Sequence, residues 1–301
     1  MRWTSLATIA AVALLSVAGC RTPEKLAPVP SSPTPAAQFP NWPAALNDFR
    51  FRWSAEPGID LANGPAVPLR AYLESRRVGD YTQNLQAVYP GFDQAVAKGP
   101  KNPEFIGTVD NQLNYIRPFA DPLYGFGPFT RDASPFTFRG NEYLHILELN
   151  PIQTGYRAYV CDGLYKVFHP TESGNGKFES AATGGLGYSK TDPPGVRVWR
   201  VEFTNKSDQA TPLPEQRGPN LAPRGNVFGH WFITGASFDG YWGDRGHLET
   251  KGYDSAHKDL VQRCADRMPD DAEQRAKFYT GEHESLPPLE PAVPGWPDNA
   301  A

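Results

Sequence analysis

The chain has 301 residues, with 29 lysines and arginines against 33 aspartates and glutamates, so its formal net charge is −4. This slightly acidic balance offers no positive field for phosphate groups and argues against a nucleic-acid partner. Hydrophobic residues make up 40% of the chain, enough for a globular core, while 28 glycines and 31 prolines predict many loops.

The N-terminus has the pattern of a secretory signal. A positive Met1-Arg2 precedes an apolar run at 6–18, which is too short for a permanent transmembrane helix. The run ends in LSVAGC at 15–20, which resembles the lipobox of bacterial lipoproteins. The resemblance implies that residues 1–19 are removed and that Cys20 carries fatty acyl chains such as palmitate. The protein would then be held on the extracytoplasmic face of the cell membrane, in the cell envelope. The alternative is an ordinary cleavage site followed by a chance cysteine.

Two further cysteines, Cys161 and Cys264, remain after lipidation of Cys20. Because disulfides persist outside the cytoplasm, we expect these two to pair. The bond would close a loop of about a hundred residues, for which chain entropy predicts a stabilisation of about 4 to 5 kcal/mol. The alternative is two separate buried thiols. Neither cysteine lies in a C-x-x-C motif, which argues against a redox dithiol.

Proline content divides the mature chain into three parts. Residues 20–43 form a lipidated, proline-rich tether, which in polyproline II form would reach roughly 70 Å. Residues 285–301 form a second proline-rich segment without a helix or strand pattern, and we expect both segments to be disordered. Between them, 44–284 is expected to fold as a single α+β domain.

The first part of this domain is expected to be helical. Leu69, Tyr72, Leu73 and Arg76 recur at helical spacing after a proline, and Gly79 would end the helix. A second amphipathic segment at 82–96 is interrupted by Pro-Gly at 90–91, so it predicts two short helices. Prolines, glycines and aromatic residues alternate through 98–136 and predict irregular chain.

The middle of the chain predicts the sheet. Alternating residues at 143–149 and 156–168, joined by a turn at 151–155, predict a hairpin. Further strands are expected at 196–203 and 228–236, and strands without intervening helices favour an antiparallel sheet of four or more strands. Helices at 255–268 and from 270 to about 279 complete the expected α+β fold, with Cys264 facing inward as pairing with Cys161 requires.

No complete catalytic or metal-binding motif is present. The best metal candidate, His247 and His257 with a nearby carboxylate, lacks a recognisable spacing, so we expect neither a metal nor a cofactor. The segment 235–239 has an aspartate where a nucleophile elbow needs its second glycine. The glycines at 184–187 lack the lysine and the helix of a nucleotide loop.

Two groups of side chains are candidate ligand-binding residues. The first places polar-tipped aromatics and acids on the sheet, where they could line a pocket or simply pack the core. It comprises Tyr143, His145, Tyr159, Asp162, Tyr165, Trp199, His230 and Trp231. The second is the loop SFDGYWGDRGH at 237–247, in which Asp239, Tyr241 and Trp242 suit sugar stacking and hydrogen bonding. The alternative is that the tryptophan in this loop covers the edge of the core.

Longer stretches of the chain resemble two known groups of proteins. Helices followed by an antiparallel meander, with RAYLESRRVGDY at 70–81, resemble the cone-shaped fold of the nuclear-transport-factor-2-like and polyketide-cyclase-like group over about 66–236. In enzymes of that group a pocket aspartate or histidine moves a proton, but no residue here matches a motif that would carry the role over. The segments GIDLANGPAVPLRAYLESRRVGDY and YVCDGLYKVF resemble uncharacterised envelope lipoproteins of actinobacteria, which implies a location and no activity.

Three functions are consistent with these patterns. The leading hypothesis is a membrane-anchored, non-enzymatic lipoprotein that binds an envelope ligand or a partner protein. The first alternative is an enzyme for proton transfer or hydrolysis, which requires His145, His230 and Asp162 side by side in one concave site. The second is cell-wall carbohydrate binding through Tyr241 and Trp242.

Overall fold

The computed structural model describes residues 41–99, 111–119, 137–171, 173–182, 193–207, 213–243 and 254–298. The predicted signal peptide, Cys20 and the tether up to residue 40 lie outside these ranges. Within them the chain has the expected α+β fold, with helices at the C-terminal end. No helix in the described ranges has both the length and the apolar character needed to cross a membrane.

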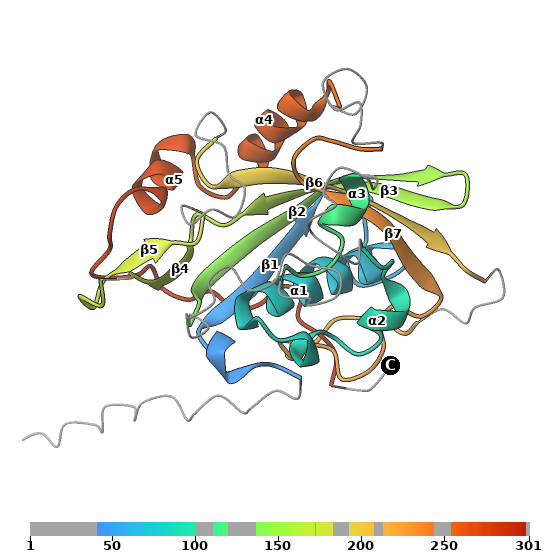
Figure 1. The fold of residues 1–301 in the computed structure, drawn as a ribbon, viewed down its shortest axis with the longest axis horizontal. Helices are drawn as coiled ribbons and strands as arrows, with labels where there is room; N and C mark the ends of the chain where they lie inside the picture. Colours follow the sequence, from blue (N-terminus) through green and yellow to red (C-terminus); the bar gives the residue numbers. More distant parts are fainter. Residues whose placement is uncertain are drawn as a thin grey trace, which may run out of the picture. The chain divides into compact units, whose positions relative to one another are not determined.

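In the described ranges, seven strands form one curved sheet, flanked by helices (Figure 1). The strands are β1 (Phe49–Ala55), β2 (Arg139–Ile152), β3 (Gly155–Gly163), β4 (Val167–Pro170), β5 (Phe178–Ser180), β6 (Val196–Asn205) and β7 (Trp231–Ser237). The helices are α1 (Ala66–Thr82), α2 (Phe92–Ala95), α3 (Asn111–Asn114), α4 (His257–Arg267) and α5 (Ala272–Tyr279), with short 3₁₀ turns at Ala44–Leu46 and Leu85–Ala87. Strands β5-β4-β2-β3-β6-β7 pair antiparallel in that order, and β1 pairs parallel with β2.

The two faces of the sheet bury different side chains. Successive residues of a strand point to opposite faces, so Leu144 and its partner Asp162 share one face, while His145 and its partner Cys161 share the other. Leu144 belongs to the larger core, which includes α1, and Cys161 to a smaller core under α4. In Figure 1, α1 and α4 accordingly lie on opposite sides of the sheet. We call these sides the α1 face and the α4 face.

The expected disulfide is present. Cys161 of β3 is bonded to Cys264 of α4, with 5.1 Å between their Cα atoms. Both residues are fully buried in the smaller core. The bond therefore fastens α4 directly to the centre of the sheet.

Helix α1 is longer than expected and does not end at Gly79. It continues to Thr82, and Gln83 then takes the left-handed conformation with φ 49°. Gly79 is instead a point of close packing, because a Cβ atom there would lie 2.6 Å from the side chain of Pro118. The break expected at 90–91 is confirmed, since α2 starts after Gly91, which has φ 90°.

The strand boundaries also differ from the expectation. The segment 156–168 forms two strands, β3 and β4, because the chain turns at 164–166 and Leu164 donates a backbone hydrogen bond to Gly195. Strand β7 starts at Trp231 and not at 228, since Gly229 with φ 56° turns the chain just before it. Strand β1 was not expected.

The expectation of a disordered C-terminal segment is wrong. Residues 285–298 run along the body, and Val293 forms a parallel bridge with Arg52 of β1, the Trp53 N–H donating to the Val293 carbonyl at 2.6 Å. Trp296 is only 1% exposed. Extended, proline-rich chain suits the edge of a sheet, where a missing N–H is tolerated. We call residues 285–298 the C-terminal strap.

Candidate functional site

A cavity of about 320 Å³ lies between the start of α1 and the start of β7. This α1–β7 pocket is lined by Asn63, Gly64, Val67, Pro68, Leu213, Pro214, Gly229, His230 and Trp231. Most of these side chains are apolar, with His230 and Asn63 as polar groups that could orient a ligand. The volume falls at the small end of the range typical of small-molecule sites, about 300 to 1,000 Å³.

Local structure holds the aromatic wall of this pocket in place. The Trp231 ring packs against Tyr156 and Phe203, with centroid distances of 5.7 and 5.4 Å. The turn at Gly229 brings the His230 ring to within 5.1 Å of the Trp231 ring. The pocket therefore combines two of the candidate residues, His230 and Trp231, on one preformed surface.

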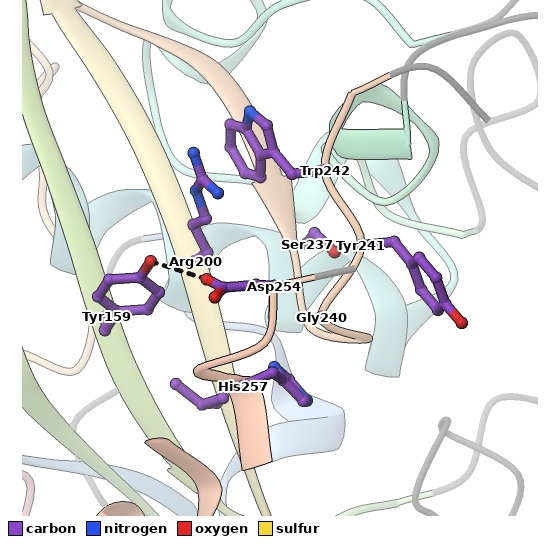
Figure 2. Close-up of a pocket in the computed structure, with 9 residues that line it drawn as sticks. Tyr159, Arg200, Ser237, Gly240, Tyr241, Trp242, Asp254 and His257 are labelled. Carbon is purple, nitrogen blue, oxygen red and sulfur yellow. Dashed lines mark hydrogen bonds between the residues drawn. The ribbon is translucent and has the colours of Figure 1, made fainter. Parts of the chain in front are cut away.

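Two members of the second candidate group, Tyr241 and Trp242, border a much smaller hollow on the α4 face (Figure 2). Trp242 lies over the Arg200 guanidinium, 3.9 Å from the ring centroid, and the Tyr159 hydroxyl donates to Asp254 at 3.1 Å. The hollow has a volume of about 10 Å³, close to the space of one water molecule. Tyr241 points away from it in Figure 2, so the two loop rings do not form one stacking platform.

Asp239 organises the loop that carries these rings. One of its carboxylate oxygens accepts hydrogen bonds from the Asn111 side chain at 2.9 Å, the Ser237 hydroxyl at 2.7 Å and the Tyr241 N–H at 3.1 Å. The geometry gives Asp239 a role in fixing the turn after β7. Residues 244–253, which include His247, lie outside the described ranges.

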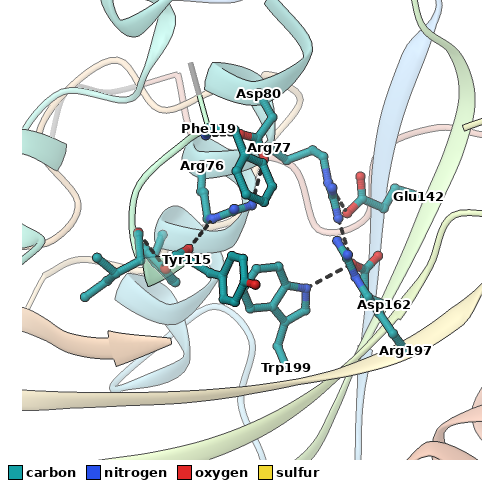
Figure 3. A network of polar contacts seen from close by, with 11 residues as sticks. Arg76, Arg77, Asp80, Tyr115, Phe119, Glu142, Asp162, Arg197 and Trp199 are labelled. Carbon is teal, nitrogen blue, oxygen red and sulfur yellow. Dashed lines mark hydrogen bonds and ion pairs between the residues drawn. The ribbon is translucent and has the colours of Figure 1, made fainter. Parts of the chain in front are cut away.

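Asp162 and Trp199 lie in a buried charge network on the α1 face (Figure 3). Asp162 accepts from Arg77 at 2.6 Å, from Arg197 at 2.9 Å and from the Trp199 indole at 2.9 Å. Burial opposes ionisation of Asp162, but the two arginines outweigh it and hold its pKa below the usual value. Arg77 also pairs with Glu142 at 3.0 Å.

The described residues around this buried network leave no room for a ligand. The void beside Trp199 and Arg76 admits no water-sized molecule. Arg76 pairs with Asp80 at 2.7 Å and its guanidinium lies 4.8 Å from the Trp199 ring centroid. Asp162 and Trp199 therefore link α1 to the sheet and do not line an accessible site.

The remaining sheet candidates lie on the α4 face. His145 contacts the Ser54 hydroxyl at 2.9 Å, and the Tyr165 hydroxyl donates to Asp270 at 2.9 Å. His145 and Asp162 point to opposite faces of the sheet, and His230 lines the α1–β7 pocket before β7. The three groups that the enzyme alternative requires are therefore not brought together.

No group of three or more histidine, cysteine or carboxylate side chains that could hold a metal ion occurs among the described residues. Of the histidines considered for a metal, His257 starts α4 beside Asp254.

No protein-family model, curated protein or solved structure is significantly similar to this chain. The resemblances to the cone-shaped fold and to envelope lipoproteins stay predictions.

Sequence reasoning missed several residues that take part in these sites. The walls of the α1–β7 pocket include Val67 and Leu213, which are unremarkable in the sequence and come together only through the fold. Ser54 and Glu56 beside His145 were also missed. The alternation of FRFRWSA at 49–55 was the available signal, since it predicts a strand with Phe49, Phe51 and Trp53 buried.

Proposed function

We propose that this protein is a lipid-anchored, extracytoplasmic binding protein that holds a small envelope ligand in the α1–β7 pocket. The lipobox-like LSVAGC at 15–20 supports the anchor and the location. The Cys161–Cys264 bond is consistent with an oxidising compartment.

The main support for the proposed binding function is the α1–β7 pocket. It has about 320 Å³ of space, against about 10 Å³ for the hollow beside Trp242. Its walls offer apolar contact through Val67, Leu213 and Trp231, while His230 can donate or accept a hydrogen bond. This combination suits a small, partly apolar molecule with at least one polar group.

Native mass spectrometry of the detergent-solubilised protein, purified from its own membranes, tests the binding function. We expect an adduct of small-molecule mass on the wild-type protein, and its loss in Trp231→Ala. Trp231 is half-buried and only part of the pocket wall, so the variant should still fold.

Trp242→Ala is the matched control, because Trp242 is also a half-buried tryptophan but lines the smaller hollow. It should keep the adduct. Absence of any adduct from the wild-type protein, or its retention in Trp231→Ala, would contradict the proposal. Loss in Trp242→Ala alone would favour the carbohydrate-binding alternative.

A further inference from the structure

Three polar side chains on the α4 face, none of which lines the α1–β7 pocket, form a chain of contacts. Ser54 lies near the end of β1, Glu56 directly follows that strand, and His145 lies in β2. The Ser54 Oγ lies 2.9 Å from His145 Nδ1, and His145 Nε2 lies 3.5 Å from Glu56 Oε1. A hydroxyl, an imidazole and a carboxylate in this order are the groups that activate a serine nucleophile.

The fold fixes this order of contacts. Ser54 and His145 are direct partners in the parallel β1–β2 register, so their side chains leave the same face at the same level. The α4 helix fixes the third member, because Arg267 donates to Glu56 at 2.5 Å. Ser54 is exposed, whereas His145 is only 7% exposed. The nucleophile is therefore accessible while its base is shielded from solvent.

We propose that Ser54, His145 and Glu56 form a hydrolytic site for carboxylic esters with a short apolar acyl group. The proposal goes beyond the binding function and does not depend on the α1–β7 pocket. Ser54 is the nucleophile, His145 is the general base, and Glu56 is a positioning residue that orients the imidazole.

The protonation pattern that this role needs fits the surroundings of His145. A proton on Nε2, which lies 3.5 Å from Glu56 Oε1 and forms no hydrogen bond within the described residues, leaves the Nδ1 lone pair to accept the Ser54 hydroxyl proton. Burial lowers the pKa of His145; the adjoining Glu56 acts to raise it, and Arg267 on α4 acts with burial to lower it. The net direction is downward, so the imidazole is neutral at neutral pH and can accept a proton.

The reaction balances with water as the co-substrate. The Ser54 Oγ bonds to the ester carbonyl carbon while its proton moves to His145 Nδ1. The carbon–oxygen bond to the alcohol then breaks, and the alcohol oxygen takes that proton. Water attacks the acyl-serine by the same route, releasing a carboxylic acid and restoring Ser54.

The C-terminal strap provides the apolar contact beside Ser54. Val293 is paired with Arg52, two residues before Ser54, and therefore lies on the same face as a diagonal neighbour of Ser54. It is 40% exposed, one of two large hydrophobic side chains exposed in the described chain. The Trp53 backbone N–H donates to the strap and the Glu56 backbone N–H donates to the Ile146 carbonyl of β2. By alternation, the Ala55 N–H points to the strap edge. There it can donate to the developing oxyanion.

A fluorophosphonate probe and nitrophenyl butyrate test the proposal on the full-length protein. We expect the probe to label one residue, Ser54, and slow hydrolysis of the ester. Ser54→Ala should abolish labelling and lower kcat/KM at least about 100-fold, as expected for loss of the nucleophile. Ser173→Ala removes another exposed serine, which contacts the Thr171 hydroxyl and, among the described residues, no imidazole, and it should change neither readout.

Glu56→Gln separates a positioning role from a merely structural one. The negative charge of Glu56 raises the pKa of His145, so its removal should move the pH midpoint of hydrolysis down while kcat falls.

Substituting Val293→Ser should reduce the preference for nitrophenyl butyrate over nitrophenyl acetate. No labelling of the wild-type protein, or equal labelling of Ser54→Ala, would overturn the proposal, and neither result bears on the α1–β7 pocket.

Discussion

Asp162 and Trp199 on strands, and Tyr165 in the turn after β3, show why single polar residues are hard to assign from sequence. Each was a candidate because a polar group on a strand suggests a pocket. Their partners are distant in sequence: Arg77 lies 85 residues before Asp162, and Asp270 lies 105 residues after Tyr165. Local periodicity cannot show these pairings. The sequence therefore could not reveal that these three side chains are hydrogen-bonded inside the core. His230 and Trp231, in contrast, do line a cavity.

The buried Glu142 carboxyl makes the stability of the fold depend on pH. Burial raises its pKa to about 8 against the attraction of Arg77. Between its ordinary pKa of 4.5 and about 8, the folded protein keeps this proton and the unfolded chain does not. Its contribution to stability is therefore present at low pH and falls as pH rises through this window, by at most about 1.4 kcal/mol per pH unit.

Urea unfolding at pH 5 to 8 measures this effect. In Glu142→Gln the side chain cannot ionise, so this component of the pH dependence should disappear and the free energy of unfolding should fall less steeply. Glu148→Gln, on the same strand but partly exposed, should keep the wild-type slope. Equal slopes for the wild type and Glu142→Gln would show that Glu142 is already ionised in the folded protein.

At the scale of elements, periodic patterns predicted most of the sheet and its helices. The hairpin of β2 and β3, strand β6 and helices α4 and α5 follow from alternation or helical spacing. The C-terminal strap could not be predicted, because it has no repeating pattern and is held by contacts to other elements. Trp296 shows this best: its indole donates to Glu74 of α1 at 2.7 Å, and the Arg70 guanidinium lies 4.4 Å from its ring centroid.

The strap should therefore contribute strongly to stability. Trp296→Ala leaves a cavity and removes one donor from the fully buried Glu74, so we expect a loss of about 3 to 5 kcal/mol in the free energy of unfolding. Trp296→Phe keeps most of the ring and loses only the N–H, and should cost about 1 to 3 kcal/mol. Urea denaturation measures both. A loss below 1 kcal/mol for Trp296→Ala would mean that the strap only rests on the surface.

At the scale of the whole molecule, the sequence predicted the α+β class but not the division of the sheet into two differently covered faces. Short apolar strands give no sign of which face a helix will cover. The two cysteines were the exception: an expected bond between 161 and 264 places a C-terminal helix against the middle of the sheet, and α4 lies there. A covalent constraint thus predicted a contact that hydrophobic patterning could not.

The proposed anchor gives the last prediction. Lipidation depends on one sulfur atom, so metabolic labelling with a palmitate analogue should mark the wild-type protein, and Cys20→Ser should lose the label and leave the membrane fraction. A Cys161→Ala/Cys264→Ala double variant is the matched control, because it removes two cysteines of the folded body and should still be labelled. Two or more acyl chains, at about 0.8 kcal/mol for each buried methylene, hold a protein on a bilayer without any protein–lipid contact. An unlabelled wild-type protein would contradict lipidation. Cys20→Ser that stays in the membrane fraction would show that some other part of the molecule provides the attachment.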